Sequence, residues 1–136
     1  MPIRKTLCLL SLPFVFIACG SSPNWDGYSP AEAGKLQSMG ITAKEATEYQ
    51  EMGFTSGTIQ HWYDQGITVQ QHITVWHDAR FTAEEAGAWN AAGFSPKDAY
   101  EWRKKDFLAA DAKRWRDGGY DLRDASKKRN KGMSAP

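Results

Sequence analysis

Three segments of the chain repeat one pattern and decide the fold: Gly40–Ala46 (GITAKEA), Arg80–Ala86 (RFTAEEA) and Gly93–Ala99 (GFSPKDA). Units of this kind begin at Gly27, Gly40, Gly53, Gly66, Arg80, Gly93, Asp106 and Gly119. Six of the seven steps between these positions are thirteen residues long, and the step from Gly66 to Arg80 is fourteen. Self-similarity at a fixed period predicts stacked repeats, which usually present surfaces rather than catalytic clefts.

Each unit carries the signals that start and end one short helix. Ser29, Thr42, Thr82 and Ser95 are predicted N-caps, because a hydroxyl at this position accepts a hydrogen bond from an otherwise unpaired backbone amide. An acidic residue follows three positions later in most units and completes a capping box; the acids of units one, two, five, six, seven and eight are Glu32, Glu45, Glu85, Asp98, Asp111 and Asp124. Glycine then closes the helix in the left-handed conformation.

Inside each helix, one large side chain recurs three residues after an alanine in most units. This position forms a predicted column: Leu36, Tyr49, Trp62, Trp76, Trp89, Trp102 and Trp115, with Lys128 in the last unit. Helices this short are marginal on their own, so neighbouring units must stack and bury the column as a continuous seam. The sequence therefore predicts an all-α array of about eight short helices over residues 27–131, stacked as a small helical solenoid, with residues 132–136 as a disordered tail.

Two units depart from the pattern. Unit three has Gly57 inside its helix and Thr58 at the acidic position, so we expect it to be weaker. Unit four contains one extra residue, and Arg80 replaces the glycine that follows it. This junction is either a kink with a functional role or an irregularity acquired by drift, and the sequence leaves open whether the extra residue lies inside the helix or at its end.

The first nineteen residues resemble a bacterial lipoprotein signal. Arg4 and Lys5 precede a mostly apolar run, Thr6–Ile17, of about twelve residues, which suits a signal peptide better than a spanning helix. Phe16–Cys19 (FIAC) resembles a lipobox, and this resemblance implies a signal peptide over residues 1–18, lipidation of Cys19 and a lipidated tether over residues 19–26. The alternative is a plain secretory signal with an incidental cysteine. Gly20 after the cysteine resembles the pattern of lipoproteins sent to the outer membrane, facing the periplasm or the surface.

Most features that would indicate catalysis or a cofactor are absent from the sequence. Cys8 and Cys19 are the only cysteines, so the exported domain has no disulfide framework and no thiol nucleophile. His72 and His77 are five residues apart and would point away from each other on a helix, and His61 lies in another unit, so no metal site is predicted. The carboxylates recur at capping positions, so we predict no enzyme activity and no cofactor.

Charge is distributed unevenly along the chain. Residues 20–79 contain two basic and seven acidic residues, whereas residues 80–136 contain thirteen basic and nine acidic residues. Eight basic residues gather near the C-terminus and are candidate contacts for an anionic ligand: Lys113, Arg114, Arg116, Arg123, Lys127, Lys128, Arg129 and Lys131. Nucleic acid is not predicted, because the domain is exported. An anionic glycan, a lipid head group or an acidic protein are the candidate ligands, and a solvated tail is the alternative.

The repeat pattern resembles short tandem helical repeats found in assorted bacterial proteins without an assigned activity, and the resemblance covers about residues 27–131. The tryptophans are either core residues, which is the favoured interpretation, or an exposed platform for a ligand; Trp25 either covers the first end of the array or rests at the membrane interface. We expect an envelope lipoprotein, anchored to the membrane by lipid, whose array is a protein-interaction or scaffolding surface for another envelope protein. Specificity would come from exposed residues such as Glu48, Glu51, Arg103, Lys104 and Lys105. The alternative function is binding of an anionic envelope glycan or lipid through the basic end or the aromatic residues.

Overall fold

The computed structural model describes residues 24–69 and 73–136. Within these residues the protein contains eight helices and no strand, so the predicted all-α class is confirmed. In chain order the helices are α1 (Pro30–Ser38), α2 (Ala43–Glu51), α3 (Ser56–Asp64), α4 (Ile73–Asp78), α5 (Ala83–Ala91), α6 (Pro96–Arg103), α7 (Ala109–Asp117) and α8 (Leu122–Arg129).

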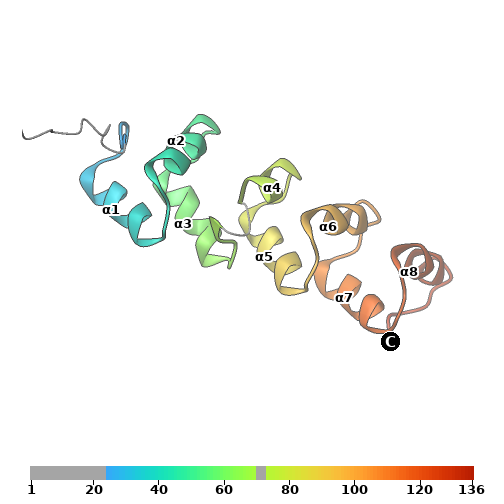
Figure 1. Cartoon of the computed structure of the whole chain (residues 1–136). Helices are drawn as coiled ribbons and strands as arrows, with labels where there is room; N and C mark the ends of the chain where they lie inside the picture. Colours follow the sequence, from blue (N-terminus) through green and yellow to red (C-terminus); the bar gives the residue numbers. More distant parts are fainter. Residues whose placement is uncertain (1–23, 70–72) are drawn as a thin grey trace, which may run out of the picture.

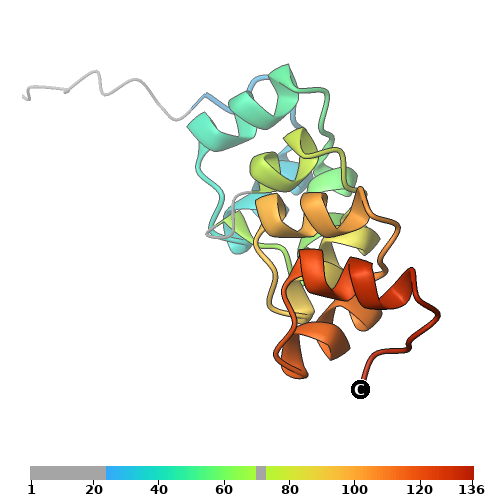
Figure 2. The same cartoon turned by 90° about the vertical axis from the view of Figure 1, so that its right-hand side faces the viewer.

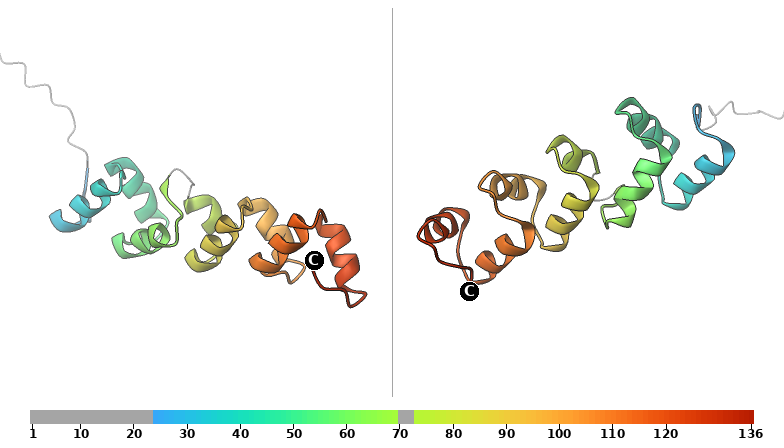
Figure 3. Two further views of the ribbon diagram at one scale, coloured as in Figure 1. Left: turned by 90° about the horizontal axis from the view of Figure 1, so that it is seen from below. Right: turned by 180° about the vertical axis from the view of Figure 1, so that it is seen from behind.

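The helices are arranged in two rows, and each row takes every second helix. α1, α3, α5 and α7 follow one another in one row, and α2, α4, α6 and α8 follow one another in the other (Figure 1). Helix α3 packs on α1, α5 packs on α3, and α7 packs on α5, so the first row is continuous. The turned views in Figures 2 and 3 show the same arrangement. The structural unit is therefore a pair of helices, twice the length of the sequence repeat.

The predicted N-caps are confirmed at four helices. The side-chain oxygens of Ser29, Thr42 and Thr82 accept hydrogen bonds of 3.2–3.3 Å from the amide three residues on, and the glutamate there bonds back to the cap residue. Ser95 accepts from the Asp98 amide at 3.1 Å and donates its hydroxyl to the Asp98 carboxylate at 2.8 Å. Each cap satisfies backbone amides that the helix itself leaves unpaired.

Helix α7 starts without such a cap, and here the sequence-based prediction was wrong. Its N-cap residue is Leu108, whose side chain has no hydrogen-bond acceptor and is 73% exposed. Asp111, which we expected to belong to a capping box, instead pairs with Arg114 one turn along the same helix. The physical reason is that a capping box needs an oxygen at both of its positions, and leucine supplies none.

Most of the helices end in the same hydrogen-bonded turn. After α1, α2, α3 and α5, the residue that follows the C-cap has a positive φ, between 76° and 83° at Gly40, Gly53, Gly66 and Gly93, which is the left-handed conformation that glycine adopts without strain. In α2 the amide of Phe54 then donates to the carbonyl of Tyr49 at 2.9 Å, as in a Schellman motif. Two residues other than glycine take the same conformation, Arg80 with φ 62° and Asp106 with φ 57°.

The predicted column lies in the core. Its members are between 0% and 6% exposed: Leu36, Tyr49, Trp62, Trp76, Trp89, Trp102 and Trp115. In five units the ring also packs on the aromatic residue five positions later, with centroids 4.9–5.7 Å apart, as in Trp89 on Phe94. This contact is the apolar partner of the turn that ends the helix. One local motif therefore both ends each helix and extends the seam.

The extra residue of unit four precedes Ile73 in the sequence. The spacing from Ile73 to Trp76, and from Trp76 to Arg80, equals the spacing of the corresponding residues in the other units. The insertion therefore falls between Thr68 and Ile73, a stretch that includes positions 70–72 outside the described residues. The described part of helix α4 begins at Ile73, directly after these positions.

Short segments cover both ends of the array. At the first end the ring of Trp25 is half-buried against the core, 6.1 Å from that of Tyr28, whose hydroxyl donates to the carbonyl of Ala46 at 3.0 Å. Trp25 thus packs on the end of the array. At the other end, residues 132–136 follow α8, and the half-buried Ala135 packs against the core.

Candidate functional site

Three arginines of the basic half support the fold through one repeated contact, which we call the arginine clamp. The guanidinium carbon of Arg103 lies 3.7 Å from the ring centroid of Phe81. Its two terminal nitrogens donate to the carbonyls of Arg80 and Ala79, at 2.8 and 3.0 Å. These carbonyls follow the end of α4, where the helix has no further amide to offer them. Arg103, which we expected to supply binding specificity, is therefore bound within the array.

Two of the eight residues proposed as anionic-ligand contacts form the same clamp. Arg116 lies 3.9 Å from the centroid of Phe94 and donates to two carbonyls at the C-terminal end of α5. Arg129 lies 3.8 Å from the centroid of Phe107 and donates to two carbonyls at the C-terminal end of α6. Arginine at thirteen-residue spacing, directly after the aromatic column, was the sequence signal for this clamp, and the sequence analysis did not use it.

The other six basic residues stay near the surface of the last two helices. Lys113 pairs with Asp117 at 2.5 Å, Arg114 pairs with Asp111, and Arg123 lies 3.6 Å from Asp124. The ammonium group of Lys128 lies 4.8 Å from the ring centroid of Tyr120. Within the described part of the chain, Lys127 and Lys131 form no ion pair and are exposed. The structure therefore gathers these residues at one end without joining them around a cavity.

The histidines make contacts between helices. Nε2 of His61 on α3 lies 2.7 Å from Oε1 of Glu84 on α5. The pKa of Glu84 is lowered, first by the hydrogen bond of its carboxylate to its own backbone amide and then by the hydrogen bond with His61. The ring of His77 packs on Phe54 with centroids 4.8 Å apart. His72 lies outside the described residues. Among the residues that are described, no group of three His, Cys, Asp or Glu side chains is placed to hold a metal ion.

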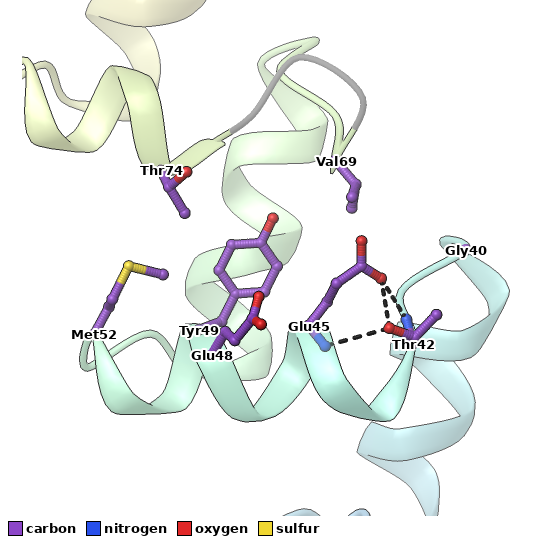
Figure 4. A pocket seen from close by; sticks show the side chains of 8 residues that line it. All are labelled: Gly40, Thr42, Glu45, Glu48, Tyr49, Met52, Val69 and Thr74. Carbon is purple, nitrogen blue, oxygen red and sulfur yellow. Dashed lines mark hydrogen bonds between the residues drawn. The ribbon is translucent and has the colours of Figure 1, made fainter. Parts of the chain in front are cut away.

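A surface pocket lies between α2 and α4, next to the irregular unit. It measures about 460 Å³ and is lined by Gly40, Thr42, Glu45, Glu48, Tyr49, Met52, Val69 and Thr74. Figure 4 shows the Tyr49 ring rising from α2 into this space, with Glu45 and Glu48 on the same helix and Thr74 facing them from α4. The extra residue of unit four falls between Thr68 and Ile73 and is therefore close in the sequence to Val69 and Thr74, which line the pocket.

Two carboxylates, of Glu45 and Glu48, line the pocket. Glu45 accepts from the amide and hydroxyl of Thr42 through one carboxylate oxygen, at 2.8 and 2.7 Å. Glu48 lies 3.4 Å from Lys44, and both side chains are largely exposed. Burial raises the pKa of Tyr49 to about 12, and the nearby carboxylates of Glu45 and Glu48 add to the rise.

Sequence reasoning placed Tyr49 in the core and gave it no further role. Its ring is indeed core, but its hydroxyl lies at the wall of the pocket (Figure 4). The available signals were that Tyr49 is the one tyrosine of the predicted column, and that one unit carries an extra residue.

Among the described residues, no helix is both long enough and apolar enough to cross a membrane. Searches against known protein families, curated proteins and solved structures found no match for the chain.

Proposed function

We propose that the protein is a bacterial cell-envelope lipoprotein whose helical array is a non-catalytic module that binds another envelope protein. The lipobox-like Phe16–Cys19 supports a lipid anchor on Cys19, and the residues after it would tether the array to the membrane. Two or three acyl chains on one residue hold a protein stably at a bilayer, whereas a single chain holds it only marginally. Gly20 after the cysteine supports location at the outer membrane.

The interaction role is supported by one observation: the aromatic seam is buried, whereas the outer faces of the helices are exposed. The tryptophans from Trp62 to Trp115 are at most 6% exposed, so their rings stabilise the array and offer no face to a ligand. The outer faces of the helices carry the charged residues together with apolar side chains such as Val75 and Tyr100, which are 47% and 38% exposed. An extended, internally supported surface of this composition suits a protein partner.

The same burial weakens the alternative of an aromatic platform for a glycan. A sugar or nucleobase stacks on the face of a ring, and none of the column rings has a free face in the described structure. Arg116 and Arg129 are held in clamps, which leaves exposed residues such as Arg123, Lys127 and Lys131 for a contact with an anionic lipid or glycan.

Crosslinking in intact cells tests the proposal directly. The full chain, with its own anchor and an affinity tag after Pro136, is crosslinked and purified. A Cys19→Ser variant is processed in parallel as the control. Reproducible recovery of one envelope protein, reduced in the control, is the expected result. Recovery of lipid or glycan alone, lost when salt is added, would contradict the proposal and favour the electrostatic alternative.

A further inference from the structure

The three arginine clamps share one spacing along the chain. In each clamp the guanidinium covers the aromatic ring 22 residues earlier, and it donates to the two carbonyls that directly precede this ring. Arg116, for example, covers Phe94 and donates to the carbonyls of Ala92 and Gly93. The acceptor half of a clamp is therefore a pair of consecutive carbonyls at a helix end, followed by an aromatic ring.

The end of α7 has the same acceptor half. Gly118 and Gly119 precede Tyr120, whose ring packs on Trp115 with centroids 5.4 Å apart. The φ angle is 85° at Gly119, close to the 76° of Gly93 at the clamped end of α5. The amide of Tyr120 donates to the carbonyl of Trp115 at 3.0 Å, the length of the corresponding bond at the end of α5. The backbone at the end of α7 thus has the conformation that binds arginine elsewhere in the array.

No described side chain takes the arginine's place at this end. A Cβ on Gly93 would lie 3.2 Å from Nη2 of Arg116, whereas a Cβ on Gly119 would meet no atom within 4 Å. Among the hydrogen bonds of the described residues, none is donated to the carbonyl of Gly118 or Gly119, and both glycines are exposed. The space that a guanidinium fills at α5 is therefore open to solvent at α7.

Two neighbouring groups border this space. The ammonium group of Lys128 on α8 lies 4.8 Å from the ring centroid of Tyr120. Lys128 follows that ring by eight residues, the spacing from which Trp102 packs on Phe94, and Phe94 is covered by an arginine as well. The ring of Pro136 packs beside the first of the two glycines, but proline has no amide hydrogen to donate. Neither neighbour therefore replaces the guanidinium.

The chemistry of this end selects a guanidinium. Carbonyls at the C-terminal end of a helix carry negative partial charge, which favours a cation. A guanidinium is planar, donates to two oxygens at once and stacks on an aromatic ring, whereas the ammonium group of lysine lacks the fork. We propose that Gly118, Gly119 and Tyr120 bind an arginine side chain of the partner protein, in the geometry of the three internal clamps. This inference rests on the proposed function and identifies where on the array the partner binds.

The first experiment measures binding of an arginine side chain by itself. Acetyl-Gly-Arg-Gly-amide is titrated into the ¹⁵N-labelled full-length protein in a nonionic detergent, and amide chemical shifts are followed by NMR. We expect saturable shifts at Gly119 and Tyr120 with a Kd on the order of 1 mM. The same peptide with citrulline, which lacks the charge, or with lysine, which lacks the fork, should bind about fivefold more weakly or less. Equal binding of the lysine peptide, or no saturable shift with the arginine peptide, would overturn the proposal.

Variants place the binding at the end of α7. Gly119→Asn keeps the left-handed backbone, which asparagine tolerates better than most residues, and fills the open space, so arginine-peptide binding should weaken about tenfold. Tyr120→Leu keeps an apolar contact for Trp115 and removes the ring, and should weaken binding about threefold. Tyr100→Leu is the matched control, because Tyr100 is 38% exposed and lies on α6 beside the occupied clamp of Arg103. If Tyr100→Leu weakens binding as much as Tyr120→Leu, or Gly119→Asn binds as wild type does, the assigned site is wrong.

Crosslinking in cells separates this inference from the proposed function. The chain is recovered with an antibody, because a tag after Pro136 would stand beside the site. Recovery of the partner by wild type, with a severalfold loss in Gly119→Asn, supports both. Equal recovery by wild type and Gly119→Asn overturns the end of α7 as the contact point and leaves the proposed function standing. If the arginine peptide binds and no chain recovers a protein, the proposed function fails, and so does the assignment of this site to a partner's side chain.

Discussion

Replacing Arg103 by alanine tests whether the arginine clamp holds neighbouring helices of one row together. The side chain is 28% exposed and joins α6 to the end of α4. The substitution removes two hydrogen bonds from a charged donor to backbone carbonyls, at 2.8 and 3.0 Å, and one cation–π contact at 3.7 Å.

The expected cost follows from these contacts. Each of the two hydrogen bonds is worth about 1 kcal/mol net at a site that water still reaches, and the cation–π contact adds about 0.5–1 kcal/mol. The ion pair with Glu85 at 3.3 Å is partly exposed and adds little. We therefore expect the free energy of unfolding to fall by about 2–3 kcal/mol and the Tm to fall by roughly 10 °C.

Urea unfolding followed by circular dichroism measures this loss. Arg103→Lys should lie between alanine and wild type, because lysine keeps the charge but lacks the fork that reaches two carbonyls at once. Lys104→Ala is the matched control: the adjacent side chain is 54% exposed and its ion pair with Glu101 spans 3.7 Å, so its loss should cost under about 0.5 kcal/mol. If Arg103→Ala costs no more than Lys104→Ala, the clamp is not a stabilising contact.

Four further predictions follow from the described contacts and the signal sequence. Trp89→Ala should lower the free energy of unfolding by about 3–5 kcal/mol in urea titrations, because the ring is 4% exposed; an unchanged value would mean that the ring is not core. Gly87→Ala should lower the Tm of the protein, since a Cβ there would lie 2.7 Å from a carbonyl oxygen after α3. Gly34→Ala, at the corresponding position of α1 where a Cβ meets nothing, should instead raise the Tm, because alanine favours the helix by about 1 kcal/mol. The pKa of Glu32 is lowered in the folded protein, first by the hydrogen bond from the Ser29 hydroxyl. The ionised Glu32 therefore stabilises the fold above the unfolded pKa of 4.5, and this stabilisation is lost as pH falls through the lower folded pKa. Glu32→Gln should accordingly flatten the acid side of a plot of the free energy of unfolding against pH. Cys19→Ser should abolish metabolic labelling with palmitate and release the protein from membranes, and retained label would refute the lipobox assignment.

Much of the local structure could be predicted because its causes lie within one unit. A hydroxyl, a carboxylate three residues later and a glycine after the last turn act through hydrogen bonds over fewer than ten residues. Thr42, Glu45 and Gly53 therefore take the roles that their spacing predicts. The unit that failed, at Leu108, failed because one of its two local partners is missing.

The candidate pocket was only partly visible in the sequence. The extra residue of unit four lies close in the sequence to two of the lining residues, and Tyr49 is the one tyrosine of the predicted column. Nothing in the order of residues shows that α2 and α4 flank a hollow, because these helices are separated by the whole of α3. Which face of Tyr49 is buried, and where its hydroxyl points, depends on that arrangement.

The sequence by itself determined the number of helices, their caps and the residues of the seam, since each depends on short-range hydrogen bonds and on the burial of one large side chain per unit. Only the tertiary structure decided that alternate helices share a row, that Arg103 reaches the end of α4, and that Gly87 lies against the end of α3. These contacts join residues more than twenty positions apart. Their geometry depends on how the turns direct successive helices across the array, which a thirteen-residue period does not encode.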